Sequence, residues 1–364
     1  MSGKKSTTDQ NFFMKLIRKQ IFIPIAALLI LILFNLIADP SFFKIYFGNN
    51  SNGDPVLKGN LITILDNASE LVILAIGMTL VTASSGGQDI SVGAAIALSG
   101  SVVLRVLCGT EARPETMHAP IIVAFLICCI VAMLFGAFNG VLVAYFKLQP
   151  MVATLILFTA GRSIAAWINN NQLPIISDPS FSYFGNFFPG IPIPSPVFIA
   201  VICMIITALV LRFTKLGLFT QAVGINSESS RLNGLNPQFI KFITYVILGL
   251  CVAVSGFIKV SRLSTINYSV IAKDIEMDAI LAVALGGNAL SGGKFNMASS
   301  ILGAYVIQFL TITLYKFDVP SSALPAYKAV VVIVLVVLSA PVVREKLGSL
   351  KKNLASGKTE KEAH

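Results

Sequence analysis

Two glycine-rich stretches of this sequence place hydrogen-bonding side chains at the edges of apolar runs. The first reads SSGGQDISVG and carries Asp89 and Ser91; the second reads LGGNALSGGKF and carries Asn288 and Ser291. Donors and acceptors of these types suit recognition of a polar solute, and a carboxylate inside a membrane also suits coupling to an ion. We therefore treat these four residues as candidates for a solute path.

Each candidate also has a structural interpretation. Ser91 and Ser291 could cap the helices that follow them. Asp89 falls in a first-turn region, where the positive end of a helix stabilises a carboxylate, and we favour this capping role over direct solute contact.

The two stretches lie 200 residues apart and match at several positions, as Ser91 and Ser291 illustrate. Non-helical backbone inside a bilayer is tolerated only where it is packed in protein or lines a water-filled cavity. Corresponding breaks in two halves predict a pathway between pseudo-repeated halves, and the direction of the repeat, parallel or inverted, stays open. The predicted hinge glycines are Gly86, Gly87, Gly93, Gly286, Gly287 and Gly293.

Nucleotide, metal and nucleophile chemistry find little support in the residues. The second stretch fails the phosphate-binding pattern G-x-x-x-x-G-K-[ST], because Asn288 and Phe295 occupy the Gly and Ser/Thr positions. Only His118 and His364 are present, and the five cysteines lie in or beside apolar runs without C-x-x-C spacing. We predict no metal site, no cofactor and no enzymatic activity, so that any ATP hydrolysis belongs to a partner chain.

Further polar candidates lie inside apolar segments. Asn67 and Glu70 follow Asp66 near one end of a predicted span, and the i,i+4 pair Asp66 and Glu70 could instead share a water-exposed face. Asn139 accompanies a G-x-x-x-G spacing in GAFNGVL, which is typical of close helix packing. Arg162 would pair with a carboxylate or snorkel to an interface, with pairing favoured.

Composition sets the class of protein that must position these residues. Of 364 residues, 55% are hydrophobic and 12% charged, which is more apolar surface than a soluble core could use. Several runs reach the roughly 20 residues that a helix needs to cross about 30 Å of hydrocarbon. We predict an all-α polytopic membrane protein with about ten spans, near 21–38, 61–83, 92–108, 119–146, 150–168, 196–213, 239–260, 275–288, 297–315 and 326–343.

The basic residues predict the orientation of these spans. With both termini cytoplasmic, 17 Lys and Arg would be inside and 9 outside, and the external loop 169–195 has none. The net charge of +10 then reflects topology, and no nucleic-acid partner is expected. Loop 169–195 should form an ordered cap, either an aromatic belt or a partner-docking surface, and Trp167 beside it an interfacial anchor.

The chain divides into three predicted parts. Residues 1–20 form a basic cytoplasmic segment, 21–343 a transmembrane permease domain, and 344–364 a cytoplasmic tail. Because the first apolar run is long and no A-x-A-like site follows it, we expect an uncleaved first helix.

The segment GINSESSRLNG between the sixth and seventh spans predicts a short cytoplasmic helix. Asn226 or Ser227 is a suitable N-cap, Glu228 falls in the first turn, and Gly234 marks the C-terminal end. Such a helix could be a lever for coupling or an ordinary solvated connector.

Four segments, together covering much of residues 60–343, resemble the inner-membrane permeases of ribose-type simple-sugar ABC importers. They are GGQDISVGAAIALSG, LQPMVATLILFTAGR, AVGINSESSRLNGLNPQFIKFITYVILG and MDAILAVALGGNALSGGKFNMASSILGAYVI. One departure is Gln88, where these permeases usually have an apolar residue. The resemblance implies ATPase subunits at the cytoplasmic face, contacted by Glu228, Arg231 and Asn233, and also an external sugar-binding protein and a second permease chain, identical or related, in a bacterial inner membrane.

Our prediction is the permease subunit of a monosaccharide importer. The residues on its substrate path would be Asn67, Glu70, Asp89, Ser91, Asn139, Asn288 and Ser291. An ion-coupled secondary transporter, with Asp89, Glu70 or Asp278 as the coupling carboxylate, is the first alternative. An ABC permease for a branched-chain amino acid or nucleoside is the second, and an enzyme acting on a lipid-linked substrate the third.

Overall fold

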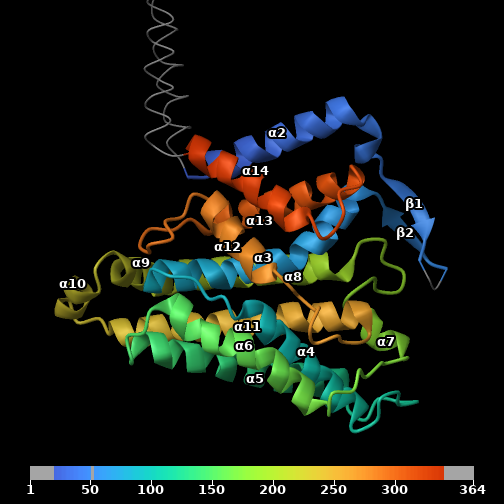
Figure 1. Cartoon of the computed structure of the whole chain (residues 1–364), viewed down its shortest axis with the longest axis horizontal. Helices are drawn as coiled ribbons and strands as arrows, with labels where there is room; N and C mark the ends of the chain where they lie inside the picture. Colours follow the sequence, from blue (N-terminus) through green and yellow to red (C-terminus); the bar gives the residue numbers. More distant parts are fainter. Residues whose placement is uncertain (1–19, 51–52, 340–364) are drawn as a thin grey trace, which may run out of the picture.

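The computed structural model describes residues 20–50 and 53–339, and these residues are mostly helical (Figure 1). The predicted cytoplasmic segment (but for Gln20) and the predicted tail lie outside them. The helices are α2 (Phe22–Ala38), η1 (Pro40–Phe43), α3 (Asn60–Ser85), α4 (Val92–Cys108), α5 (Ile121–Ala144), α6 (Pro150–Ile168), α7 (Pro179–Ser182), α8 (Ser195–Phe213), α9 (Leu216–Ile225), α10 (Ser227–Leu232), α11 (Pro237–Leu263), α12 (Ile275–Leu285), α13 (Met297–Lys316) and α14 (Leu324–Ser339).

The prediction of helix alone missed one small sheet. Strands β1 (Tyr46–Asn49) and β2 (Pro55–Lys58) pair antiparallel, and the Leu57 amide donates to the Pro192 carbonyl. Figure 1 places this hairpin and α7 at one end of the molecule and α10 at the other. The hairpin thereby helps to build the predicted outer end.

Among the residues that the structure describes, six helices are long and apolar enough to cross a membrane: α3, α5, α6, α8, α11 and α13. The protein is therefore a multi-pass membrane protein. Each of the ten predicted segments coincides with a helix, but α2 and α4 have 17 residues and α12 has 11, so ten complete crossings stay a prediction. At 1.5 Å per residue α12 extends only about 16 Å, roughly half of the hydrocarbon thickness. Helix α9 was not predicted.

Helices α3 and α11 form the centre of the bundle. Helix α11 packs against α5, α3 and α4, while α3 also packs against α13, α8, α12 and α9. The predicted close packing at G-x-x-x-G is confirmed: a Cβ at Gly136 would collide with the Tyr245 carbonyl oxygen. From the other side, a Cβ at Gly249 would collide with the Ala132 carbonyl oxygen, so α5 and α11 approach almost backbone to backbone.

The loop 169–195 forms a packed cap on the C-terminal end of α11, as expected for an ordered cap. The Ser261 hydroxyl donates to the Phe181 carbonyl at 2.5 Å, and the Phe181 ring lies edge-on to Phe257. At the start of α7, hydrogen bonds from Ser180 hold the pKa of Asp178 below its usual value.

Replacing Gly249 by Ala should lower the free energy of unfolding by about 1–3 kcal/mol, because the methyl group must push α5 away from α11. Thermal melting of the purified protein in detergent measures the loss. Gly217→Ala is the control, because its nearest neighbour, 3.2 Å away, is a methyl of the flexible Leu211 side chain. Equal melting temperatures for the two variants would contradict the packing argument.

Candidate functional site

The two glycine-rich breaks contact each other. Gly86 ends α3 with φ of 69°, and a Cβ at this position would lie 2.7 Å from the Ser291 carbonyl oxygen. The Gln88 amide donates to the Leu290 carbonyl at 3.2 Å. This hydrogen bond joins residues 202 positions apart in the chain. It is made by Gln88, the residue at which the sequence departs from the resemblance.

Helix α9 packs onto this junction of the two breaks. The Gly293 amide donates to the Ala83 carbonyl at 2.9 Å, and the Cα of Gly224 in α9 lies so close that a Cβ would overlap both groups. Three of the predicted hinge glycines have positive φ: Gly86, Gly287 and Gly293. The other three allow close approaches: Gly87 to Pro150, Gly93 to Glu276 and Arg162, and Gly286 to Ser299. Hinge motion itself stays a prediction.

Asp89, Ser91 and Asn139 form one buried polar cluster. Asp89 Oδ1 accepts from the Ser91 amide at 2.8 Å and from its hydroxyl at 2.6 Å. The Asn139 amide donates to Asp89 Oδ2 at 3.1 Å and to Ser91 Oγ at 2.9 Å. Because the Asp89 carboxylate already closes the turn before α4, its contacts are those of the predicted capping role. Ser91 is the N-cap by position, but its side chain makes no capping bond.

The same Asp-x-Ser turn occurs twice more in the chain. Asp39 accepts from the Ser41 amide at 2.9 Å, and Asp178 accepts from the Ser180 amide at 2.9 Å. Both precede short helices in the loops. This recurrence favours a structural use of the motif at Asp89, and the sequence alone contained the pattern.

Asn288 belongs to a second buried cluster that closes the break before α13. Its amide donates to Ser300 Oγ at 2.7 Å, and its Oδ1 accepts from the Asn296 amide at 2.7 Å. The Thr79 hydroxyl of α3 donates to the same Ser300 Oγ at 2.7 Å. The capping interpretation of Ser291 is wrong, because the N-cap of α13 is Asn296, five residues further along the chain. Ser291 itself is exposed in the preceding turn.

Asn67 and Glu70 line a polar cavity of about 360 Å³ in the N-terminal half of α3, which we call the outer cavity because the predicted topology places this end outside. Helices α3, α11, α12, α13 and α14 and the loop before α12 all contribute to its wall. The other hydrogen-bonding or charged residues there are Lys259, Lys273, Asp278, Gln308, Thr311, Tyr315 and Lys328. Of the seven predicted path residues, these two are the ones that line this cavity.

An ion-pair cluster forms one side of this outer cavity. Glu70 is 2% exposed and lies 2.9 Å from Lys259 Nζ and 3.1 Å from Arg262 Nη1. Arg262 also pairs with Asp66 at 2.8 Å and donates to Asn67 Oδ1 at 3.0 Å. A shared water-exposed face is therefore wrong for Glu70, because α11 covers it. The i,i+3 pair Lys259 and Arg262, opposite an i,i+4 acidic pair, was the signal available in the sequence.

A separate ion pair lies on the other side of the outer cavity. Lys328 of α14 contacts Asp278 of α12 at 2.7 Å. Arg162 was expected to pair with a carboxylate. It donates to the carbonyl oxygens of Tyr268 and Ile271, at 2.7 and 2.9 Å, and the Glu276 carboxylate is close enough to attract it, with both groups against Gly93. The loop before α12 folds over α6 and supplies these carbonyls. Trp167 is 75% exposed.

The predicted short helix is confirmed at the opposite end of the bundle. The Asn226 side chain caps α10 by accepting from the Ser229 amide at 2.9 Å, and Gly234 follows with φ of 80°. Glu228 and Arg231 line a cavity of about 420 Å³ that also includes Lys147 and Lys241. Asn233 is exposed and donates back to Ser229 at 2.8 Å.

Within residues 20–50 and 53–339, no group of three or more His, Cys, Asp and Glu side chains is placed to bind a metal ion. All five cysteines are free thiols. The polar clusters can donate and accept hydrogen bonds, and the outer cavity offers both charges and neutral donors.

A multi-pass bundle with a polar cavity at one end and a capped surface helix at the other defines a membrane permease. The chain belongs to the family described as branched-chain amino acid transport system, permease component, whose model matches residues 60–340. It is 34% identical to the fructose import permease FruF of Bifidobacterium longum, over 98% of this chain and 97% of that protein.

Two relatives from Escherichia coli strain K12 are similar over most of their length. The galactofuranose transporter permease YtfT is 37% identical, covering 87% of this chain and 88% of that protein. The ribose import permease RbsC is 34% identical, covering 86% and 91%. No solved structure matches the sequence.

Replacing Asp89 by Asn should change the free energy of unfolding by less than about 1 kcal/mol, whereas Asp89→Leu should lower it by about 1–3 kcal/mol, because three buried donor groups lose their acceptor. The Asn amide can keep the bonds from Ser91. Asn139 can rotate its side-chain amide, because its Oδ1 has no partner. Thermal melting compares the two variants, and equal losses in both would contradict a capping role.

Proposed function

We propose that this chain is the membrane-spanning subunit of an ABC importer that translocates a monosaccharide. An external binding protein would deliver the sugar, and separate ATPase chains would power its passage. The observation that carries the proposal is the nearly end-to-end similarity to import permeases named for fructose, galactofuranose and ribose.

The outer cavity fits such a role. A monosaccharide presents many hydroxyl groups, each of which can donate and accept a hydrogen bond. The Asn67 and Gln308 amides and the Thr311 and Tyr315 hydroxyls line the cavity beside three cations, Lys259, Lys273 and Lys328. A site of mixed donors and acceptors can bind a sugar weakly enough to release it, as transport requires.

The remaining predicted path residues receive different roles in this proposal. Asp89, Ser91, Asn139 and Asn288 hold the two breaks in shape, since their polar atoms bond mainly to one another and to nearby backbone. The outer cavity would receive the sugar, and rearrangement at the junction of the breaks would release it. The pseudo-repeated halves and the hinge glycines belong to this proposal.

The proposed topology places both termini in the cytoplasm of a bacterial inner-membrane protein. Residues 21–343 form the permease domain. The end of the bundle with α10 then faces the ATPase chains, and the end with the hairpin and α7 faces the binding protein. A second permease chain, identical or related, completes the pore.

Uptake by the assembled complex tests the proposal. Proteoliposomes with permease, ATPase chains and binding protein should accumulate one labelled monosaccharide from a panel only when ATP is supplied. Leucine and a nucleoside belong in the panel, because they test the alternative substrates. Uptake that proceeds without ATP and partner proteins, or that stops when an ion gradient collapses, would instead support a secondary transporter.

Replacing Glu228 and Arg231 together by Ala should reduce ATP-dependent uptake by about tenfold or more. Truncating two side chains that contact the ATPase chain costs on the order of 1–3 kcal/mol of binding free energy. Both side chains line the cavity beside α10 and leave the packed core untouched, so membrane expression should not change. Lys44→Ala, an exposed charge at the other end, is the control. Unchanged uptake with normal complex formation would refute the coupling role of α10.

A further inference from the structure

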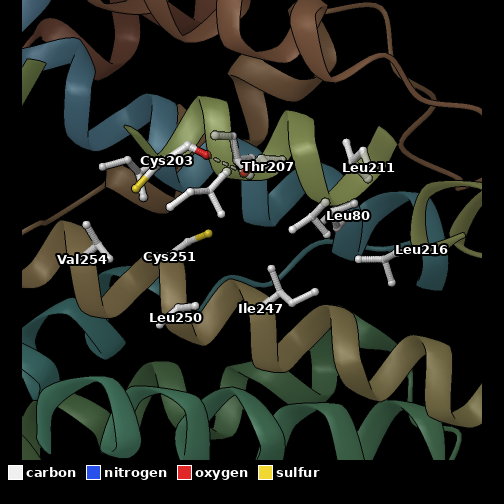
Figure 2. Close-up of a pocket in the computed structure, with 13 residues that line it drawn as sticks. Leu80, Cys203, Thr207, Leu211, Leu216, Ile247, Leu250, Cys251 and Val254 are labelled. Atoms are coloured by element: carbon white, nitrogen blue, oxygen red, sulfur yellow. Dashed lines mark hydrogen bonds between the residues drawn. The ribbon is translucent and has the colours of Figure 1, made fainter. Parts of the chain in front are cut away.

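A third cavity, of about 270 Å³, lies between α8 and the central helices (Figure 2). Cys203 and Thr207 project into it from α8, opposite Leu250 and Cys251 of α11, and Leu216 of α9 lies at one end. It is separate from the outer cavity and from the cavity beside α10, with which it shares no residue.

The chemistry of this apolar cavity rejects water and sugar alike. Its lining is aliphatic apart from two thiols and one hydroxyl, and the Thr207 hydroxyl already donates to the Cys203 carbonyl at 2.8 Å. A single water needs only about 10–15 Å³, but it also needs two to four polar partners, which this space does not provide. An apolar occupant is the one that fits.

The cavity opens on an exposed apolar face of the bundle. Of the residues in the most apolar 18-residue stretch of α8, only 11% are buried. Among the residues that line the cavity, Ile206 is 54% exposed and Leu250 is 41% exposed. A flexible hydrocarbon chain from the surrounding bilayer can therefore enter sideways between α8 and α11.

Cations stand at one end of this opening. Leu211 and Leu216 line the cavity, and their chain neighbours Arg212 and Lys215 are exposed. Phe213 is 78% exposed between them, with the Arg212 guanidinium 6.0 Å from its ring centroid. Two basic residues with an aromatic ring are typical of the membrane interface, where cations attract anionic lipid headgroups.

We propose that the apolar cavity binds one acyl chain of an anionic phospholipid, whose headgroup lies against Arg212 and Lys215. The lipid fills the space between α8 and α11 and fastens α8 to the bundle. This inference does not depend on which solute the protein carries.

Photolabelling in vesicles tests the site. The full chain is reconstituted in phosphatidylethanolamine and phosphatidylglycerol with a trace of phosphatidylglycerol that carries a diazirine on one acyl chain. After irradiation, mass spectrometry maps the labelled residues. Cavity residues of α8 and α11 should be labelled, together with lipid-facing residues of α5 such as Leu134, which is 64% exposed.

A cavity-filling variant separates a bound chain from general lipid contact. Cys203→Phe should lose the labelling of α11 in the cavity while α5 keeps its labelling, because the phenyl ring occupies the acyl site. Ile130→Phe, on the exposed face of α5, is the matched control and should keep both. Equal cavity labelling in Cys203→Phe and the unchanged chain would overturn the acyl site.

The headgroup is tested separately. Arg212→Gln with Lys215→Gln should weaken cavity labelling by the phosphatidylglycerol probe and leave labelling by a phosphatidylcholine probe unchanged. Identical labelling by both probes in the unchanged chain would overturn the anionic specificity. Absence of cavity labelling, with a crosslink between the α8 helices of two copies, would assign the face to a second permease chain and overturn the proposal.

Discussion

The structure depends on one constraint: in the apolar part of a membrane protein, backbone polar groups outside a helix must find hydrogen-bond partners within the protein. Two glycine-rich breaks create such groups, and the protein satisfies them by bringing the breaks together. The Gly293 amide bonds to the Ala83 carbonyl, and the Gln88 side chain bonds to the Leu290 carbonyl. Packing of α3, α12 and α13, and the position of α9 over the junction, follow from this contact.

Buried polar side chains obey the same constraint. It separates side chains whose hydrogen bonds are used within the fold from side chains that line a cavity and can bind a solute. Asp89 bonds to Ser91 and Asn139, and Asn288 bonds to Asn296 and Ser300, so each residue holds the shape of its own break. Glu70 is held by two cations, yet its cavity remains open and lined with further donors. The ion pairs of Glu70 and Asp278 thus lie at the outer cavity, whereas the junction of the breaks uses neutral groups and one capping carboxylate, that of Asp89.

Local rules read from the sequence succeeded where a short segment decides its own conformation. The cap at Asn226, the turn at Asp89 and the close packing at Gly136 each depend on neighbours within a few residues or on the size of one side chain. The same rules failed where a distant element intervenes. Arg162 bonds to carbonyls of a loop more than 100 residues away, and Ser291 is not the cap of α13 because Asn288 holds the preceding turn.

The sequence by itself determined the class of protein, the positions of most helices and the family, because hydropathy, helix caps and ordered motifs depend on residues close together in the chain. Only the tertiary structure decided which polar residues line the outer cavity. It also decided that the two breaks meet and that an apolar space remains beside α8. Those outcomes depend on which helix faces which, and helix rotation is fixed by packing between segments far apart in the chain.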